Sequence, residues 1–428
     1  MNLEKYLNKL YSLHTFGVKL GLENIQGFLD HLGNPQRKLK AFHIAGSNGK
    51  GSTASFIASI LSELHFKVGL YTSPHFVRFN ERIQVLQHGK KNHRTEIPDE
   101  YIAGFIAANE KFIDDQKLTF FEVTTALAFK YFCEQNVDYA VIETGLGGRL
   151  DATNVLSPLG VIITSISLEH TNLLGDTIEK IAAEKAAIIK KNAKVFVGKI
   201  PDEAFKVIEN RCIELGCELF PIQDFIIETG NMIELYTEEM ELDDWTMPLK
   251  GNYQKYNAAL AVITVSKTLN KDNFGTINHG IKNVVTNTGL QGRYEFYFSK
   301  PDIIFDSAHN PESVEHFLSE FAKEKEKYSK RVLLFGAMKD KAIKEMLQLL
   351  RNFFEEVHVT TIGFERASTL KELKSIAEEI KLSVFPEENP ISFVRQFEQN
   401  NPGNCLVVLG SMYLLGVIKS SIMKNKFA

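Results

Sequence analysis

The sequence predicts an α/β protein with a large N-terminal domain, residues 1–296, and a smaller parallel-sheet domain, residues 297–428. Three observations support this prediction. An apolar run ends near residue 46 in a glycine-rich turn that opens an apolar helix. The chain has 428 residues, more than one ordinary domain. Beyond residue 301, short strand-like and helix-like segments alternate, which is typical of a parallel sheet covered by helices.

The glycine-rich turn is the centre of the larger domain. It lies between a predicted strand, Leu39–Ala45, and a predicted helix, Ala54–Leu64, whose apolar residues repeat every three or four positions. Glycines at such a turn let backbone N–H groups wrap phosphate oxygens, and Lys50 could reach the β- and γ-phosphates. The common pattern G-x-x-x-x-G-K-[ST] is not met, because Gly51 follows the lysine and the hydroxyl comes later, at Ser52. A structural turn remains the alternative.

Composition excludes several functional classes. The 49 basic and 53 acidic residues nearly balance, for a net charge of −4, which leaves no footprint for nucleic acid or an anionic membrane. The four cysteines are scattered without a C-x-x-C pair, so we expect no disulfide framework and a reducing cytoplasm. We expect no signal peptide and no spanning helix, because the first ten residues are charged and no long apolar run occurs.

Two polar segments follow predicted strands of the larger domain. After the strand Lys67–Tyr71 comes a proline-broken stretch, residues 72–83, which is a candidate substrate loop or a plain surface connection. The strand Asp138–Glu143 ends in a carboxylate and precedes a glycine-rich loop. Phosphate-loop enzymes place a Mg²⁺ ligand at such a position, although a lone acid there is usually only exposed. Residues 88–94 read as a solvated hairpin tip.

The remaining elements complete an alternating pattern. On pattern alone Lys185 is an ordinary surface lysine, and Asp176 with Glu179 reads as a helix N-cap. The larger domain is predicted to contain helical segments in 1–32, helices 120–132, 177–190 and 203–215, strands 159–165 and 193–197, hairpin material in 225–247 and a helix around Asn257. The smaller domain is predicted to contain strands 303–305, 332–335, 357–360 and 406–409 and helices 311–325, 342–350, 370–380 and 412–418.

Seven motifs in this order resemble the folylpolyglutamate synthase/dihydrofolate synthase family of the Mur ligase superfamily. The family loop G-T-N-G-K-G-S is matched with Ser47 in place of Thr, which accounts for the unusual glycine-lysine-glycine order. Two departures are Glu169-His170 for the usual Asp-His and Ala187 for the usual Gly. The matching stretches are Gly46–Ser52, Ser73–His75 with Asn80–Arg82, Glu143–Asn154, Glu184–Ala186, Gly292–Arg293, Asp306–Pro311 and Gly410–Tyr413.

The resemblance implies a phosphate-loop ATPase domain, a Rossmann-like C-terminal domain, and ATP with two Mg²⁺ ions as cofactors. It implies that Ser52 and Glu143 hold one Mg²⁺, that Glu143 and His170 hold a second, and that Lys185 is carbamylated. Lys50, His170 and Lys185 match catalytic positions. The implied ATP-binding residues are Gly46, Ser47, Asn48, Gly49, Lys50, Gly51, Ser52, Thr53, Asn257, Arg293, Asp306 and His309, and the implied substrate-binding residues are Ser73, Pro74, His75, Arg82, Asp151 and Ser411.

The implied activity is an ATP-dependent ligation of L-glutamate to a folate-type carboxylate through an acyl phosphate, with release of ADP and phosphate. The acceptor is dihydropteroate, tetrahydrofolate or both. The resemblance places ATP in a cleft between the domains of a cytoplasmic monomer, with no nucleic-acid or membrane partner. Two alternatives stay open: a cell-wall Mur-type amino-acid ligase, which Gly51 and the Asp306–His309 segment disfavour, and a nucleotide-dependent switch that makes no product.

Overall fold

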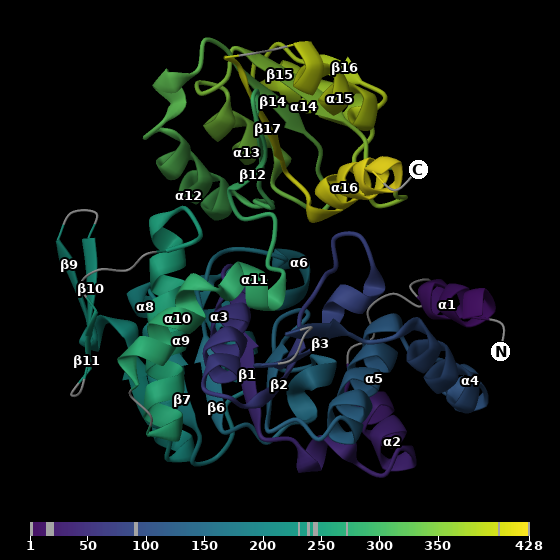
Figure 1. Ribbon diagram of the computed structural model, residues 1–428, viewed down its shortest axis with the longest axis vertical. Coiled ribbons are helices and arrows are strands. Elements are labelled where there is room, and N and C mark those ends of the chain that lie inside the picture. Colours follow the sequence, from purple (N-terminus) through teal and green to yellow (C-terminus); the bar gives the residue numbers. More distant parts are fainter. Residues whose placement is uncertain are drawn as a thin grey trace. The chain divides into compact units, whose positions relative to one another are not determined.

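The computed structural model divides the chain into two compact units (Figure 1). Unit 1 comprises residues 1–74, 79–248 and 255–289, and unit 2 comprises residues 75–78, 249–254 and 290–428. The last change of unit falls after Gly289, ahead of the predicted boundary at 296/297, because β12 (Glu295–Ser299) pairs with β13 (Asp302–Phe305) of unit 2. The described residues are 3–13, 21–89, 93–229, 232–237, 240–242, 247–270, 273–400 and 403–426.

Unit 1 is built on a sheet with the strand order β4-β3-β2-β5-β1-β6-β7-β8. Neighbouring strands run parallel except at β2–β3 and β3–β4, which are antiparallel. The strands predicted around β1, β2, β5, β6 and β7 are confirmed, whereas β3, β4 and β8 were not predicted. The bounds are β1 Ala41–Ala45, β2 Lys67–Tyr71, β3 Ile83–Gln87, β4 Arg94–Glu96, β5 Tyr139–Glu143, β6 Gly160–Ile163, β7 Lys194–Val197 and β8 Glu218–Pro221.

Helices cover both faces of this sheet. One face packs against α1, α2, α4 and α5 over one half and against α7 and α8 over the other. The opposite face packs against α3, which in turn contacts α10 and α11. Helices α4, α10 and α11 were not predicted. The bounds are α1 Leu3–Ser12, α2 Glu23–His31, α3 Lys50–Glu63, α4 Asp99–Asp115, α5 Phe120–Glu134, α6 Thr171–Leu174, α7 Ile178–Ala186, α8 Asp202–Leu215, α9 Asn252–Leu269, α10 Phe274–Lys282 and α11 Val284–Thr288.

Two local predictions for unit 1 need correction or restriction. Helix α7 is capped by Thr177, whose side chain accepts from the N–H of Lys180, whereas Asp176 accepts from the Lys180 amine at 2.7 Å. The predicted hairpin material forms an antiparallel sheet of β9 (Ile226–Thr229), β10 (Met232–Thr237) and β11 (Met240–Leu242). Parts of the predicted segments, residues 14–20, 90–92, 230–231, 238–239 and 243–246, lie outside the described residues.

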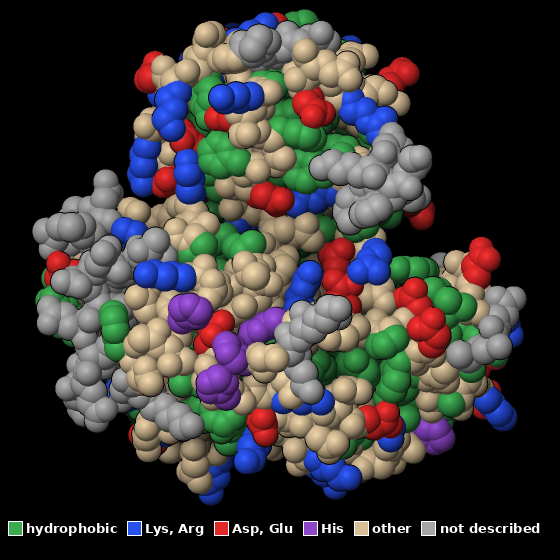
Figure 2. Space-filling view, in the orientation of Figure 1, with side chains coloured by type: hydrophobic (Ala, Val, Ile, Leu, Met, Phe, Trp, Pro, Cys, Tyr) green, Lys and Arg blue, Asp and Glu red, His purple; other side chains and the backbone are tan. Residues whose placement is uncertain are grey.

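Helix α3 is buried along almost its whole length and is also fixed at its C-terminal end. Asn287 donates to one carboxylate oxygen of Glu63 at 2.8 Å, and the Nδ1 atoms of His88 and His279 lie 3.2 and 3.3 Å from the other. Burial alone would raise the pKa of Glu63, but these neighbours hold it below its usual value. Histidine side chains gather on one face of unit 1 (Figure 2).

Unit 2 contains the predicted parallel sheet, in the order β12-β13-β17-β14-β15-β16. Only the edge pair β12–β13 is antiparallel. Apolar clusters fill both faces of the sheet. Across the described residues of both units, no helix is long and apolar enough to cross a membrane. The remaining bounds are β14 Arg331–Phe335, β15 Glu356–Thr360, β16 Phe385–Glu387, β17 Cys405–Leu409, α12 Pro311–Phe321, α13 Ile343–Leu350, α14 Leu370–Glu379, α15 Pro390–Asn400 and α16 Met412–Lys426.

The packing of β2 against α5 gives a test of the core of unit 1. A Cβ added at Gly69 would lie 2.7 Å from the ring of Phe132, which is fully buried. We expect Gly69→Ala to lower the free energy of unfolding by about 1–3 kcal/mol, because the ring cannot retreat within a filled core. The matched control is Gly27→Ala in α2, where an added Cβ meets nothing within 4 Å. That variant should gain about 0.5–1 kcal/mol from helix propensity. Urea unfolding of both variants measures this, and equal stability would contradict it.

Candidate functional site

The loop between β1 and α3 depends on two glycines that lie against neighbouring elements. Gly46 has φ +153°, and a Cβ there would lie 1.9 Å from Oγ1 of Thr164. Gly49 has φ +84°, and a Cβ there would lie 2.4 Å from Oδ1 of Asn257 in α9. Neither position accepts a side chain without rearrangement. The predicted ligand residue Asn257 therefore packs directly on the loop.

The loop is fastened to the segment that follows the adjacent strand β6. The N–H groups of Ser47 and Asn48 donate to the carbonyl and the hydroxyl of Ser165, each at 2.8 Å. Thr164 donates its hydroxyl to the carbonyl of Asn48 at 2.6 Å, and the N–H of Ser167 donates to the Ser47 hydroxyl at 3.0 Å. Ser47 was a predicted nucleotide contact, whereas Thr164 and Ser165 were not predicted. Their signal, polar residues ending a strand, gains meaning only once β6 is known to lie beside β1.

Two lysine amines meet at the carbonyl of Gly46, and a glutamate pairs with one of them. The Lys50 amine donates to this carbonyl at 2.8 Å and to that of Ser47 at 3.0 Å. The Lys185 amine donates to the same Gly46 carbonyl and to Oε1 of Glu169, both at 2.9 Å. The side chains of Lys185 and Glu169 are 1% and 7% exposed. The pattern-based reading of Lys185 as a surface residue is therefore wrong, because its helix α7 packs this position inward.

This arrangement shifts the proton affinity of both partners. Burial lowers the pKa of Lys185, and the neighbouring Glu169 carboxylate opposes that change. Burial would raise the pKa of Glu169, but Lys185 and Lys50 hold it well below its usual range. Glu169 is therefore a carboxylate, and Lys185 loses its proton more readily than an exposed lysine does. A neutral amine is the form that reacts with an electrophile.

The predicted metal ligands lie around the same loop. Glu143 ends β5, which pairs in parallel with β1, and its Oε2 accepts from the Ser73 N–H at 2.9 Å. Ser52 is buried in the first turn of α3, and His170 precedes α6 with φ 46°. Among the described residues, no three His, Cys, Asp or Glu side chains are grouped to hold a metal ion. The Ser52 hydroxyl and the Glu143 carboxylate fit Mg²⁺, which keeps water and phosphate oxygens as its other ligands.

Asp151, a predicted substrate-binding residue, lies in the glycine-rich loop after β5, and its substrate role stays a prediction. It is buried, and its Oδ2 accepts from the N–H groups of Gly145 and Leu146 at 2.8 and 2.9 Å. Its Oδ1 accepts from the N–H of Thr153 at 3.0 Å. Burial raises the pKa of this carboxyl group. The contacts give Asp151 the role of holding the glycine-rich loop after β5 in shape.

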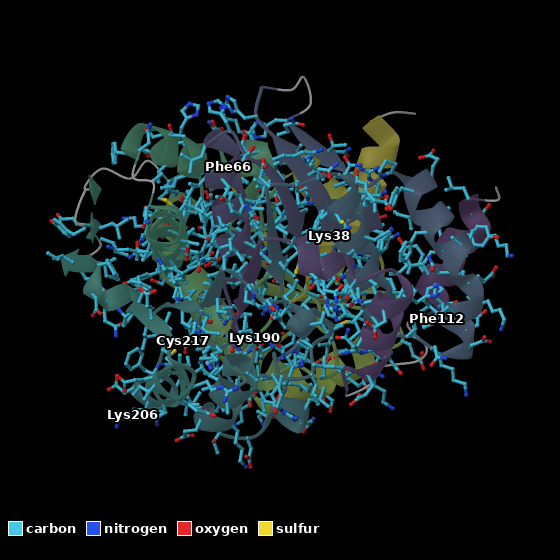
Figure 3. The ribbon with its side chains drawn as sticks, turned by 90° about the horizontal axis from the view of Figure 1, so that it is seen from below. Lys38, Phe66, Phe112, Lys190, Lys206 and Cys217 are labelled. Carbon is cyan, nitrogen blue, oxygen red and sulfur yellow. The ribbon has the colours of Figure 1, made fainter. Side chains whose placement is uncertain are left out.

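Polar side chains also hold the C-terminal end of the glycine-rich loop, at Asn154. The Lys190 amine donates to Oδ1 and to the backbone carbonyl of Asn154, at 2.7 and 3.1 Å. Lys190 and Cys217 lie side by side in Figure 3, where the Cys217 thiol donates to the Lys190 carbonyl at 3.2 Å. His43 contacts Thr153 Oγ1 at 2.8 Å, and burial lowers its pKa to about 3, with a smaller contribution from Lys190. His43 is therefore a neutral structural histidine.

The predicted acceptor loop is shared between the units. Ser73, Pro74 and Arg82 belong to unit 1, whereas His75 belongs to unit 2. Arg82 is buried at the end of a short 3₁₀ segment, with its guanidinium 5.3 Å from the ring centroid of Phe120. This burial places the Arg82 side chain against the core of unit 1.

The predicted nucleotide contacts of unit 2 gather where β13 ends. Asp306 is buried, and its carboxylate accepts from the N–H groups of Tyr294 and Ala308 at 2.7 and 2.8 Å. Burial raises the pKa of Asp306 to about 6, although these bonds and Arg293 oppose the shift. Arg293 donates to the Ser307 hydroxyl.

Two further predicted residues of unit 2 have local hydrogen bonds. The Nδ1 atom of His309 lies 3.0 Å from the Ser307 carbonyl oxygen. Ser411 follows β17, the strand beside β13, and its hydroxyl accepts from the Tyr413 N–H at 3.2 Å. The structure therefore brings Arg293, Asp306, His309 and Ser411 to the carboxyl edge of one sheet, where α/β proteins bind ligands.

Comparisons with known proteins agree with this architecture. The family model of the Mur ligase middle domain matches residues 44–265, and that of the Mur ligase glutamate ligase domain matches residues 292–412. The chain is 35% identical to the dihydrofolate synthase/folylpolyglutamate synthase of Bacillus subtilis, over 95% of this chain and 96% of that protein.

Solved structures give the same result. The structure of Escherichia coli FolC in complex with DHPP and ADP superposes with a TM-score of 0.87 at 28% identity, covering 99% of this chain and 98% of that one. The bifunctional folylpolyglutamate synthase/dihydrofolate synthase of Yersinia pestis, complexed with AMPPNP and Mn, superposes with a TM-score of 0.85 at 28% identity, covering 98% of each chain.

The raised pKa of Asp306 gives a prediction of pH dependence. Because its folded pKa of about 6 exceeds the reference value of 3.8, the folded protein binds this proton more tightly. The resulting stabilisation is complete below pH 3.8 and is lost as the pH rises through about 6. Relative to Asp306→Asn, the free energy of unfolding of the wild type should fall by on the order of 1 kcal/mol between pH 5 and 8. Denaturant unfolding of both proteins across this range measures the difference, and a constant difference would contradict it.

Proposed function

The chain belongs to the folylpolyglutamate synthase/dihydrofolate synthase family of Mur ligases, and we propose that it joins L-glutamate to a folate-type carboxylate at the cost of ATP. The observation that carries this proposal beyond a nucleotide-binding fold is the buried Lys185 amine on the Gly46 carbonyl. A nucleotide switch needs a phosphate loop, but it has no use for a second buried lysine beside that loop. A ligase that binds a carboxylate and a phosphate at one place can use a second lysine there.

The reaction follows from the chemistry of the groups. A carboxylate is a poor electrophile because its leaving group would be oxide. Transfer of the γ-phosphoryl group of ATP to the acceptor carboxylate gives an acyl phosphate and ADP. The neutral amine of L-glutamate then attacks the acyl carbon and a tetrahedral intermediate forms. As the amide forms, the nitrogen gives up one proton to a base or to the departing phosphate, and phosphate leaves. Both anionic reactants must be neutralised, and Lys50 at the N-terminus of α3 supplies positive charge at the phosphates.

The nucleotide and metal assignments are part of the proposal. Loop residues Gly46 to Thr53, with Asn257, bind the phosphates, and Arg293, Asp306 and His309 are nucleotide contacts of unit 2. Ser52 and Glu143 hold one Mg²⁺, and Glu143 with His170 holds a second. Bound Mg²⁺ neutralises phosphate charge and polarises the phosphoryl oxygens. The Ser73 N–H, which donates to Glu143, restricts that carboxylate to a narrow range of orientations.

We further propose that Lys185 is carbamylated in the active enzyme. Burial lowers its pKa, so the neutral amine that reacts with CO₂ forms more readily here than at an exposed lysine. Addition of CO₂ to the neutral amine forms an N–C bond and releases one proton, which leaves a carboxylate-like group in place of the amine. Such a group can orient the second metal ion and the acceptor.

The acceptor and the assembly are the remaining parts of the proposal. We infer that the enzyme uses both dihydropteroate and tetrahydrofolate. Ser73 to Arg82 form the acceptor loop, and Ser411 contacts L-glutamate. We infer that the protein is a monomer without nucleic-acid or membrane partners. We also infer that it is cytoplasmic, which agrees with its four free cysteines, since the cytoplasm is reducing.

The first prediction from this proposal concerns turnover. With ATP, Mg²⁺ and L-glutamate, the protein should release ADP when either 7,8-dihydropteroate or tetrahydrofolate is present, and not without an acceptor. Coupled detection of ADP, with mass analysis of the product for one added glutamate, measures this. Turnover with one acceptor alone would reduce the proposal to that single step. No turnover by folded, ATP-binding protein would contradict it and favour a cell-wall Mur-type ligase or a switch.

The second prediction concerns Lys185. We expect Lys185→Ala to lose ligation by at least about a hundredfold while the Kd of AMPPNP changes by less than about threefold, since the loop amides and Lys50 remain. With ¹³C-bicarbonate, the wild type should show a carbamate carbon resonance that the variant lacks. Lys180→Ala on the same helix, at a 62% exposed side chain, is the control.

Loss of Lys185 leaves Glu169 buried without its cation, which can destabilise the fold by about 3–5 kcal/mol. A thermal scan therefore accompanies the assay. The double variant Lys185→Ala/Glu169→Gln removes the unpaired charge and should also lack ligation. Normal ligation by either variant would show that Lys185 has no catalytic role.

A further inference from the structure

The acceptor loop leaves unit 1 after Pro74 and returns to it at Phe79, and the residues between them, His75–Arg78, pack as part of unit 2. Within this excursion, Phe76 is half-buried against the apolar cluster of unit 2. A plain surface connection of unit 1 would not place an aromatic side chain against the apolar cluster of unit 2. The packing of Phe76 therefore constrains the loop.

Phe76 occupies a socket, which we call the Phe76 socket, formed by Gly292, Gly416 and Lys419. A Cβ added at Gly292 would lie 2.6 Å from the tip of the Phe76 ring. A Cβ added at Gly416 in α16 would lie 1.9 Å from the Phe76 carbonyl oxygen. Both walls are therefore glycine because the phenylalanine approaches the backbone too closely for any side chain.

Lys419 closes the socket. It is 3% exposed, and its amine lies 5.4 Å from the centroid of the Phe76 ring, within cation–π range. The same amine donates to Glu295 at 2.6 Å and to Gln291 at 2.8 Å. Glu295 also accepts from the N–H of Gly292 at 2.7 Å. The Glu295 carboxylate thus links Lys419 to Gly292, the two residues that contact the Phe76 ring.

The Phe76 socket adjoins the nucleotide contacts of unit 2. The Gly292 carbonyl accepts from the guanidinium of Arg293 and from the N–H of Ser307, each at 3.0 Å. Three residues before Phe76 in the acceptor loop, the Ser73 N–H donates to Glu143. Within a few residues the acceptor loop therefore touches both a proposed metal ligand and the residue that orients Arg293.

We propose that Phe76 is a positioning residue that couples binding of the acceptor to binding of the nucleotide. This inference rests on the proposed function. An acceptor that orders the loop holds Phe76 in its socket, the seated ring fixes Gly292, and the Gly292 carbonyl holds the Arg293 guanidinium in place for the nucleotide. Because binding free energies are linked, the nucleotide must strengthen acceptor binding by the same factor.

The test is the Kd of AMPPNP measured with and without saturating 7,8-dihydropteroate, in the absence of L-glutamate, for the wild type and Phe76→Ala. In the wild type, dihydropteroate should tighten AMPPNP binding by at least about fivefold. In Phe76→Ala this gain should disappear, while the Kd of AMPPNP alone changes by less than about twofold. Phe76→Leu, which refills the socket, should recover most of the gain. A merely structural role would instead shift the two Kd values together.

The matched control is Phe385→Ala, another partly exposed ring of unit 2, which packs on His358 and should keep the coupling. Gly416→Ala provides an independent variant, because its methyl group displaces Phe76 and should remove the coupling as Phe76→Ala does. A double variant should then lose nothing more. A thermal scan shows whether each variant is folded.

The outcomes separate this inference from the proposed function. Absence of coupling in the wild type, or full coupling in folded Phe76→Ala and Gly416→Ala, overturns the role of Phe76. If wild-type protein still ligates glutamate in that case, the proposed function stands without it. Absence of any ligation overturns both.

Discussion

The closeness of Gly46 to Thr164 is the constraint on which the site depends. Because glycine has no side chain, the loop can turn tightly beside β6 at Gly46. The Gly46 carbonyl then faces two amines, those of Lys50 and Lys185. Glu169 then balances the charge gathered at this point. The Lys50 amine already lies within the loop, on the carbonyls of Gly46 and Ser47. A phosphate that binds the loop therefore has to move this amine only from a carbonyl oxygen to a phosphate oxygen.

Rigidity of the loop comes from elements far from it in the sequence. Helix α3 starts in the loop and is held at its other end by Glu63, which binds Asn287 and lies beside two histidines. Its burial on nearly all sides leaves it no freedom to tilt. Asn257 of α9 packs against the loop from a third direction. Precise placement of phosphate donors therefore rests on the whole layer of α3, α9, α10 and α11.

Much of this could be read from the sequence because it is local. The strand, loop and helix around Lys50 follow from apolar spacing and glycine chemistry, and the alternation after residue 301 identifies the second sheet. Helix α4 was missed although Ile102, Phe105 and Ile106 have helical spacing. The burial of Lys185, the hydroxyls of Thr164 and Ser165, and the transfer of His75–Arg78 to unit 2 could not be predicted. Each depends on which strands become neighbours, and residue patterns do not encode that order directly.

Phosphoryl transfer imposes one more demand on such a structure. Without the acceptor carboxylate, the γ-phosphoryl group of ATP can pass only to water, so the transfer is productive only when the acceptor is in place. An enzyme can meet this demand if the acceptor helps to complete the nucleotide site. A short loop that contacts Glu143 at one end and rests on Gly292 in its middle has the connections needed for that task. Under our proposal for Phe76, the glycines of the Phe76 socket then serve the order of the reaction, because they admit the phenylalanine beside the nucleotide contacts.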